Sequence, residues 1–405
     1  MTQQVISAKI PFAIWALTFC AFGIGTTEFV IVGLLPTIAN DLSISISSTG
    51  LLVTLFALGV AIGGPLFTAL TGKIERKKLL LFTVVIFTIG NLIAFFADGV
   101  MLLQLSRVIT GTTHGVFFAN AVIIASNTVA DNKKASAISL VFAGLLVSTA
   151  TGVPLGTYIG VNYGWRMTFL FIAVWGMLSL IILSYLLPGQ EKPTESLKLK
   201  DLPKVFKNTS VLIVLLSNIF AYTGTFIVFT FLTPLLEKIT GFSVNTINII
   251  LLVYGVGVAL GNIAGGWISN HKPSKILVYL FFSHTIVLFI LSLVLTIKFA
   301  MIITLFLLGF FAFSNVPALQ LLVVQLSERK FPGSAGIASS LNVSAFNIGA
   351  AAGAYIGGLV VDSTLTIKGT PWVGGLFVIV ALLFGVLNWQ RNKSLEKYTR
   401  TWKAK

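Results

Sequence analysis

Two charged residues lie deep inside long apolar segments of the sequence, and a histidine follows one of them at helical spacing. Glu28 interrupts the first apolar segment and Arg107 the fourth. His114 comes seven residues after Arg107, which in an α-helix returns it to within about 20° of the same face. Gly111 and Phe118 continue that stripe. A charge is costly inside an apolar segment and usually marks a pathway for ions or protons, so these side chains are the first candidates for chemistry.

Proton transfer is the functional interpretation of Glu28, Arg107 and His114. Burial disfavours a charged carboxylate, so Glu28 can hold a proton at neutral pH and release it when water or a cation arrives. Glu28 and Arg107 lie roughly 12 Å and 9 Å from the outer ends of their segments, so an ion pair between them is geometrically feasible. A histidine side chain ordinarily titrates near neutrality, so His114 is a candidate proton relay. Two structural alternatives stay open: a permanent Glu28–Arg107 pair, and a His114 that only bonds a neighbouring helix. His284 lacks such a stripe, and we interpret it as structural.

The composition places these residues in a membrane protein. Of the 405 residues, 56% are hydrophobic and 10% are charged, and the mean hydropathy is +0.98. A soluble chain carries about 25% charged residues, so soluble, disordered and fibrous classes are excluded. The single cysteine, Cys20, excludes an intramolecular disulfide framework, and with three histidines it leaves no basis for a metal site.

Twelve segments are long and apolar enough to cross a bilayer, which predicts an all-α integral membrane fold. They are approximately residues 11–37, 50–71, 79–97, 101–129, 135–160, 165–187, 210–236, 245–268, 275–296, 299–324, 333–361 and 371–390. An even number of spans places both termini on one side, and 22 of the 27 Lys and Arg residues fall on that side. The positive-inside rule then makes both termini cytoplasmic. The net charge of +15 is therefore a topology signal that faces anionic lipid, and we expect no nucleic-acid partner.

A polar, basic segment divides the chain into two halves that repeat each other. The predicted organisation is a six-helix half at 1–187, a cytoplasmic linker at 188–209, a second six-helix half at 210–391 and a basic tail at 392–405. At a shift of about 198 residues, Leu58–Gly63 matches Val256–Gly261, and Gly111 matches Gly309. Both halves run in the same direction, which predicts parallel repeats with a substrate site between them, as in secondary transporters.

Several motifs resemble the major facilitator superfamily, and within it the drug:proton antiporter branch with twelve spans. They are the fourth-helix motif at Arg107–Gly115, the fifth-helix antiporter motif at Gly144 with Gly152–Gly156, the sixth-helix entry at Gly164–Phe169, and the first-helix residues Thr27–Phe29 and Gly33–Pro36. Over nearly its whole length the chain is similar to arabinose and sugar efflux permeases, purine efflux pumps and chloramphenicol-type exporters. The resemblance implies proton-coupled antiport.

Two motifs are expected to take part in gating. The fifth-helix residues are Gly144, Gly152, Pro154 and Gly156, where small side chains allow close helix approach and the proline removes a backbone donor. The resemblance implies a hinge or seal between the halves there; ordinary packing is the alternative. The loop after the second segment carries Lys73, Glu75, Arg76, Lys77 and Lys78. It departs from the family pattern, because Gly72 stands where the family has an Asp and Glu75 where it has a second Gly.

The second half carries no charge inside its segments, since Phe226 stands at the repeat position of Glu28 and Leu305 at that of Arg107. We therefore expect proton coupling in the first half. An apolar cavity with few polar groups suits small neutral or amphipathic ligands. The substrate-cavity candidates are Phe118, Tyr222, Phe226, Asn315, Gln320, Asn342 and Asn347. Interhelical hydrogen bonding is the alternative for the amides.

The sequence thus predicts a secondary active transporter that exports a small neutral or amphipathic compound, such as a sugar, a purine base, a nucleoside or a drug, by alternating access. It lacks the Gly-Lys-Ser/Thr nucleotide loop and hydrolase motifs, so we expect no enzyme and no cofactor, with the proton gradient as energy source. We expect a monomer in the plasma membrane, with substrate, protons and lipid as partners. An importer working by symport or facilitation and a non-transporting membrane sensor are the alternatives.

Overall fold

The computed structural model describes residues 11–71, 74–130, 133–189, 208–269, 273–331 and 334–403, without the side chains of 68, 69, 134, 135, 335 and 394–403. The chain folds as two compact units, unit 1 at Met1–Ser196 and unit 2 at Leu197–Lys405. The boundary falls within the predicted linker 188–209, most of which lies outside the described residues, as do Lys73 and part of the tail.

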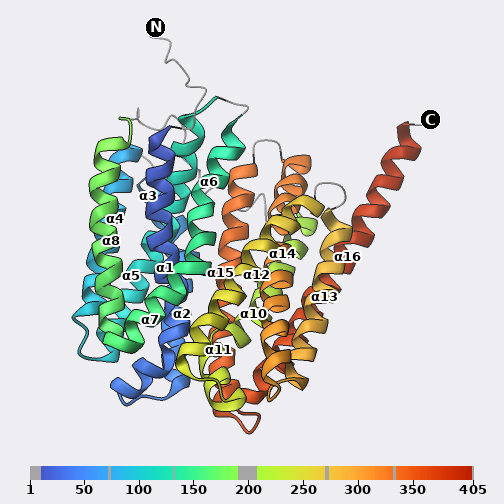
Figure 1. Ribbon diagram of the computed structural model, residues 1–405. Coiled ribbons are helices and arrows are strands. Elements are labelled where there is room, and N and C mark those ends of the chain that lie inside the picture. The colour runs from blue at the N-terminus through green and yellow to red at the C-terminus, as the bar shows by residue number, and fades with distance from the viewer. Residues whose placement is uncertain are drawn as a thin grey trace. The chain divides into compact units, whose positions relative to one another are not determined.

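Each unit is built from long helices that run side by side (Figure 1). Unit 1 contains α1 (Phe12–Asp41), α2 (Ile46–Leu58), η1 (Gly59–Gly63), α3 (Gly64–Leu70), α4 (Arg76–Phe95), α5 (Val100–Asn127), α6 (Lys134–Val147), η3 (Ser148–Gly152), α7 (Val153–Tyr163) and α8 (Trp165–Leu186). Unit 2 contains α10 (Thr209–Phe229), α11 (Leu232–Leu235), η5 (Leu236–Thr240), α12 (Val244–Ser269), α13 (Pro273–Leu293), α14 (Lys298–Lys330), α15 (Ala335–Asp362), η6 (Ile367–Gly369) and α16 (Thr370–Lys403). In the described part of the chain, twelve helices are long and apolar enough to span a membrane, so the twelve predicted segments are confirmed.

One predicted segment is broken in the structure. The seventh apolar segment was expected to run from about 210 to 236, but α10 ends at Phe229 and α11 begins at Leu232. Pro234 explains the interruption, because its nitrogen cannot donate to the carbonyl of Thr230 and its ring crowds that carbonyl.

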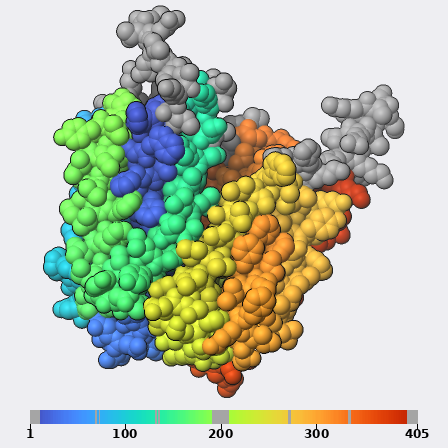
Figure 2. Space-filling view, in the orientation of Figure 1, coloured from blue at the N-terminus to red at the C-terminus, as the bar shows by residue number. Residues whose placement is uncertain are grey.

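The outer surface of the units is apolar. In Figure 2, α8 covers part of the visible face of unit 1. The outward residues of this helix are large and exposed, among them Met177, Ile181 and Tyr185. A soluble monomer rarely exposes a contiguous apolar face of this kind, whereas a helix in lipid requires one.

The two units repeat one helix packing. In unit 1, α4 lies against α5 and α8, and α1 lies against α6, α7 and α8. In unit 2, α13 lies against α14 and α16, and α10 lies against α15 and α16. The correspondence follows chain order, which confirms the predicted parallel repeat.

Glycines mark the same close approach in both units. A side-chain carbon built at Gly111 would lie 2.9 Å from the carbonyl carbon of Phe56, and one built at Gly309 would lie 2.6 Å from the carbonyl oxygen of Tyr254. Phe56 and Tyr254 stand at the same repeat offset as the two glycines. The glycines therefore let α5 and α14 pack backbone to backbone against their neighbours.

The two π-helical turns of unit 1 have α-helix at their repeat positions in unit 2, whose own π-helical turn, η5, lies elsewhere, after Pro234. The turns of unit 1 span Gly59–Gly63 and Ser148–Gly152, and each ends two residues before a proline, Pro65 or Pro154. A proline cannot donate to the carbonyl four residues earlier, so the ladder of helical bonds is displaced there. In unit 2, Ile263 replaces Pro65, and α12 stays a regular α-helix through the same glycine-rich sequence.

Candidate functional site

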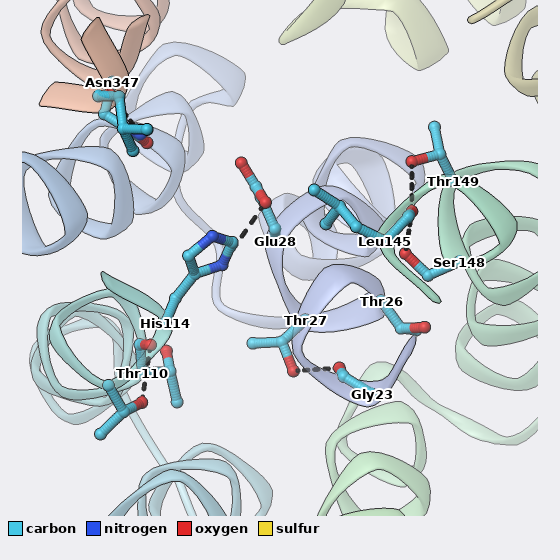
Figure 3. A network of polar contacts seen from close by, with 12 residues as sticks. Gly23, Thr26, Thr27, Glu28, Thr110, His114, Leu145, Ser148, Thr149 and Asn347 are labelled. Carbon is cyan, nitrogen blue, oxygen red and sulfur yellow. Dashed lines mark hydrogen bonds and ion pairs between the residues drawn. The ribbon is translucent and has the colours of Figure 1, made fainter. Parts of the chain in front are cut away.

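The carboxylate of Glu28 faces the imidazole of His114 inside unit 1. Glu28 lies in the middle of α1 and His114 in the middle of α5, and Figure 3 shows the two side chains directed toward each other. Nδ1 of His114 lies 3.5 Å from Oε2 of Glu28. Glu28 is 9% exposed and His114 is 7% exposed, so both ends of this acid–base pair are withdrawn from bulk solvent. The pair can take up or release one proton.

Arg107 holds the backbone beside this pair. Its guanidinium donates to the carbonyl oxygens of Thr27, at 2.8 Å, and Glu28, at 3.3 Å, while Nε donates to the carbonyl of Leu52, at 3.2 Å. Arg107 is 1% exposed. The contact between Arg107 and Glu28 is therefore made to the backbone, and the Glu28 carboxylate is directed to His114. Arg107 ties α5 to α1 and α2.

The stripe predicted along α5 is present, and it faces Phe56 of α2. The guanidinium carbon of Arg107 lies 4.4 Å from the centroid of the Phe56 ring. The His114 ring meets Phe56 edge to face at 5.7 Å between centroids, and Phe118 lies 4.8 Å from His114. Gly111, between them, approaches the Phe56 backbone. Two aromatic rings, Phe56 and Phe118, thus contact the imidazole of His114.

Sequence reasoning did not identify Phe56 or the polar contact next to Glu28. Thr27 donates to Oδ1 of Asn91 on α4 at 3.3 Å, and Asn91 is fully buried. Asn91 in turn donates to the carbonyl of Phe87 at 2.9 Å. A polar residue in the middle of the third apolar segment was the available signal for Asn91.

The antiporter motif packs against the helix that carries Glu28. Gly144 approaches the backbone of α1 near Phe22, where a side-chain carbon would lie 3.1 Å from the Phe22 nitrogen. Gly152 and Gly156 approach side chains of α1, namely Thr26 and Val30. Pro154 follows the π-helical turn η3 at the start of α7. The close helix approach expected from this motif is thus made to α1.

The other π-helical turn packs against the helix that carries Arg107 and His114. A side-chain carbon at Gly59 would lie 2.8 Å from the carbonyl oxygen of Val108 and 3.0 Å from the nitrogen of Thr112. A side-chain carbon built at Gly64, just after η1, would lie 2.9 Å from Cα of Gly115. Both irregular turns of unit 1 therefore contact the two helices that hold the acid–base pair.

The loop motif makes its described contacts inside unit 1. Arg76 donates to Oδ1 of Asn120 on α5 at 3.2 Å, and Lys77 donates to the carbonyl of Leu187 after the end of α8 at 2.5 Å. Lys78 lies 3.1 Å from Glu75 in an ion pair. Glu75, the departure from the family pattern, is therefore neutralised locally by Lys78.

In unit 2, two of the predicted cavity residues, Tyr222 and Phe226, lie within one aromatic cluster, and a third, Asn315, hydrogen-bonds Tyr222. The aromatic cluster consists of Tyr222, Phe226, Phe229, Tyr254, Phe313 and Phe346, which come from α10, α12, α14 and α15. Its rings form a chain of contacts with centroid distances from 4.2 Å to 6.0 Å. The hydroxyl of Tyr222 donates to Oδ1 of Asn315 at 2.8 Å and lies 3.1 Å from the carbonyl oxygen of Ala312.

Gln320 and Asn342 hydrogen-bond each other. Nδ2 of Asn342 donates to Oε1 of Gln320 at 2.7 Å, and Gln320 donates to Ser339 at 2.6 Å. Asn218, which sequence reasoning missed, donates to Oδ1 of Asn342 at 2.7 Å. This amide chain ties α10, α14 and α15 together. Asn347 instead donates to the carbonyl of Val343 within its own helix.

His284 lies fully buried on α13. In the described part of the chain, neither of its ring nitrogens has a hydrogen-bond partner.

Comparison with known proteins assigns the chain to a family. The sequence model of the Major Facilitator Superfamily matches residues 17–336 and 214–404. The chain is 44% identical over 384 residues to the uncharacterized MFS-type transporter YtbD of Bacillus subtilis, covering 95% of this chain and 96% of that protein. It is 34% identical over 375 residues to the inner membrane transport protein YdhP of Escherichia coli K12, covering 93% and 95%.

Two further matches, at lower sequence identity, also cover nearly the whole chain. The putative transporter AraJ of Escherichia coli K12 is 29% identical over 391 residues, covering 96% of this chain and 95% of that protein. A bacterial homologue of the human lysosomal transporter Spinster, solved inward-facing and unoccupied, has a TM-score of 0.70 at 16% identity, covering 94% and 96% of the two chains. That likeness bears on the fold. The chain is thus a multi-pass membrane transporter that belongs to the Major Facilitator Superfamily.

Proposed function

We propose that this transporter exports a small neutral or amphipathic compound in exchange for protons. The observation that carries the proposal is the buried contact between Glu28 and His114, in which Nδ1 of His114 lies 3.5 Å from Oε2 of Glu28. The neighbouring Arg107 donates its hydrogen bonds to backbone carbonyls and does not pair with the Glu28 carboxylate. A buried acid–base pair, in the interior of a membrane transporter, is suited to carrying a proton.

Charge provides the physical basis for coupling. Arg107 keeps its proton throughout, so the Glu28–His114 pair is the part of the site that titrates. With the pair deprotonated, the three side chains sum to zero charge, and with one proton bound they sum to +1. The two states differ in the cost of burial, so each favours a different conformation of the surrounding helices.

The two π-helical turns are the elements through which this change would act. One, η1, contacts α5, and the other, η3, contacts α1, so both adjoin the helices whose charges change. Displaced helical bonds at Pro65 and Pro154 lower the cost of bending there. We propose that α2 and α3 on one side, and α6 and α7 on the other, bend at these turns during alternating access.

The same proposal includes an orientation. We propose that both termini face the cytoplasm and that the membrane is the plasma membrane; the positive-inside rule, applied to Arg76, Lys77 and the other basic loop residues, supports this orientation. A reporter enzyme active only in the cytoplasm, fused to the C-terminus, should be active. Activity of a periplasmic reporter at the same position would contradict this orientation.

Transport in proteoliposomes with an imposed pH gradient tests the function. Arabinose, adenosine, hypoxanthine, chloramphenicol and ethidium would be offered to the wild type, to Glu28→Gln and to Glu237→Gln, a matched change at an exposed residue. We expect gradient-driven movement of one compound that is lost in Glu28→Gln, while exchange down its own gradient persists. Equal transport with and without the pH gradient in the wild type would instead establish a facilitator.

A further inference from the structure

Buried polar atoms without partners lie within the aromatic cluster of unit 2. In the described part of the chain, the hydroxyl of Tyr254 and Nδ2 of Asn315 have no hydrogen-bond partner. Tyr254 is 2% exposed and Asn315 is fully buried. Polar atoms buried in this way are normally paired, so an unpaired donor marks a place for another group.

These atoms converge on one region. The Tyr222 hydroxyl donates to Oδ1 of Asn315 at 2.8 Å, and the chain of ring contacts through Phe346, Phe226 and Phe229 connects Tyr222 to Tyr254. The Tyr254 ring stacks on Phe229, with a centroid distance of 5.1 Å and an angle of 19° between the planes. Phe313 and Phe346 contact Tyr222 from two further helices. Two unpaired polar groups are thus set among flat apolar surfaces.

We propose that this cluster binds a neutral, planar ring compound with an amide-type edge, as the substrate site of the export function proposed above. The rings of Phe226, Phe229 and Phe346 provide surfaces on which a flat ligand stacks. Asn315 and Tyr254 pair with the edge of the ligand. An amide or lactam edge carries a donor beside an acceptor: its carbonyl oxygen can accept from Nδ2 of Asn315, and its N–H can donate to the hydroxyl oxygen of Tyr254.

The same chemistry excludes other ligands. In the membrane segments of unit 2, the described residues provide no formal charge near the cluster, since Phe226 and Leu305 stand at the repeat positions of Glu28 and Arg107. Charged ligands would therefore lack a counter-ion. A sugar would bring several hydroxyls to a cluster that offers two unpaired groups, and each buried hydroxyl left unpaired weakens binding about tenfold or more.

Binding to the detergent-solubilised full chain, without any gradient, tests this site. The probes are radiolabelled hypoxanthine, adenosine and chloramphenicol as ring compounds, and arabinose as the sugar. We expect at least one ring compound to bind, and Tyr254→Phe and Asn315→Ala each to raise its Kd about tenfold. Tyr355→Phe, at a half-exposed tyrosine on α15, should leave the Kd unchanged.

Thermal unfolding separates binding from a structural role. Tyr254→Phe removes a buried hydroxyl without a partner, so Tm should stay the same or rise while the Kd rises. A lower Tm with an unchanged Kd would overturn the proposal, as would binding of arabinose in place of the ring compounds or the absence of ring binding at millimolar concentration. If a ring compound binds in a way that depends on Tyr254 but is not transported by a pH gradient, the binding site proposed here is supported and proton coupling is rejected.

Discussion

Arg107 donates a hydrogen bond to the backbone carbonyl of Glu28, at 3.3 Å, while the Glu28 carboxylate faces His114. The arginine is thus a fixed positive charge that positions α1, and the carboxylate stays able to exchange a proton. A direct Arg107–Glu28 ion pair would instead keep the carboxylate ionised.

The anchoring role of Arg107 predicts a loss of stability on substitution. Arg107→Lys keeps the charge but replaces a planar, five-donor group with one that cannot reach three carbonyls at once. We expect the free energy of unfolding to fall by about 2–4 kcal/mol, together with a loss of transport, because a buried charge would lose its partners. Thermal unfolding of the purified protein measures this, with Arg329→Lys at an exposed position as the control. An unchanged Tm would show that the three hydrogen bonds are dispensable.

Substrate binding should become tighter as pH rises. If substrate displaces the proton from the Glu28–His114 pair, proton and substrate weaken each other's binding equally. Release of one proton changes the Kd by at most about tenfold per pH unit. Titration by binding at several pH values should show this slope in the wild type and none in Glu28→Gln. A Glu28→Gln variant that keeps the wild-type slope would place the proton elsewhere.

The π-helical turns predict opposite effects of proline removal on rate and stability. Pro154→Ala restores a backbone donor, so the helix can continue regularly and the protein should become more stable by about 1–3 kcal/mol. The hinge would stiffen, so we expect the transport rate to fall about tenfold or more. Pro317→Ala provides the control, because Pro317 lies inside α14 without a π-helical turn. Equal rates in both variants would reject η3 as a hinge.

The repeated glycine contact predicts matched destabilisation in the two units. Gly111→Ala and Gly309→Ala each bring a methyl group into a neighbouring backbone, at Phe56 and Tyr254. We expect each to cost about 1–3 kcal/mol, because backbone cannot move aside as a side chain can. Gly99→Ala is the control, since nothing lies within 4 Å of a carbon built there. Unfolding measurements that find both variants as stable as the wild type would contradict the close packing.

Gln320 and Asn342, first considered for substrate binding, are expected to stabilise the fold through the hydrogen bonds of the amide chain. Gln320→Leu removes the acceptor of Asn342 and the donor to Ser339. Stability should fall by about 1–2 kcal/mol, since buried groups lose partners. Substrate Kd should stay within about twofold of the wild type. A large rise in Kd at wild-type stability would return Gln320 to the substrate site.

The sequence by itself determined the number of spans, their parallel repeat and the membrane-buried location of Glu28, Arg107 and His114. These follow from segment length, from periodicity and from the cost of burying charge, all of which act along the chain. The α5 stripe was likewise predictable, because a helix returns to the same face every seven residues.

Tertiary structure decided what each of these residues contacts. Periodicity gives the face of a helix but does not specify the neighbouring helix or the atom it presents, so the backbone contact of Arg107 and the His114 partner of Glu28 were not determined. Asn218 was missed for the same reason, since its partner Asn342 is distant in the chain. The π-helical turn η1, by contrast, has a signal in the sequence that was not used: nearly the same glycine-rich segment is α-helical in unit 2, where Ile263 replaces Pro65 and the helical bond can form.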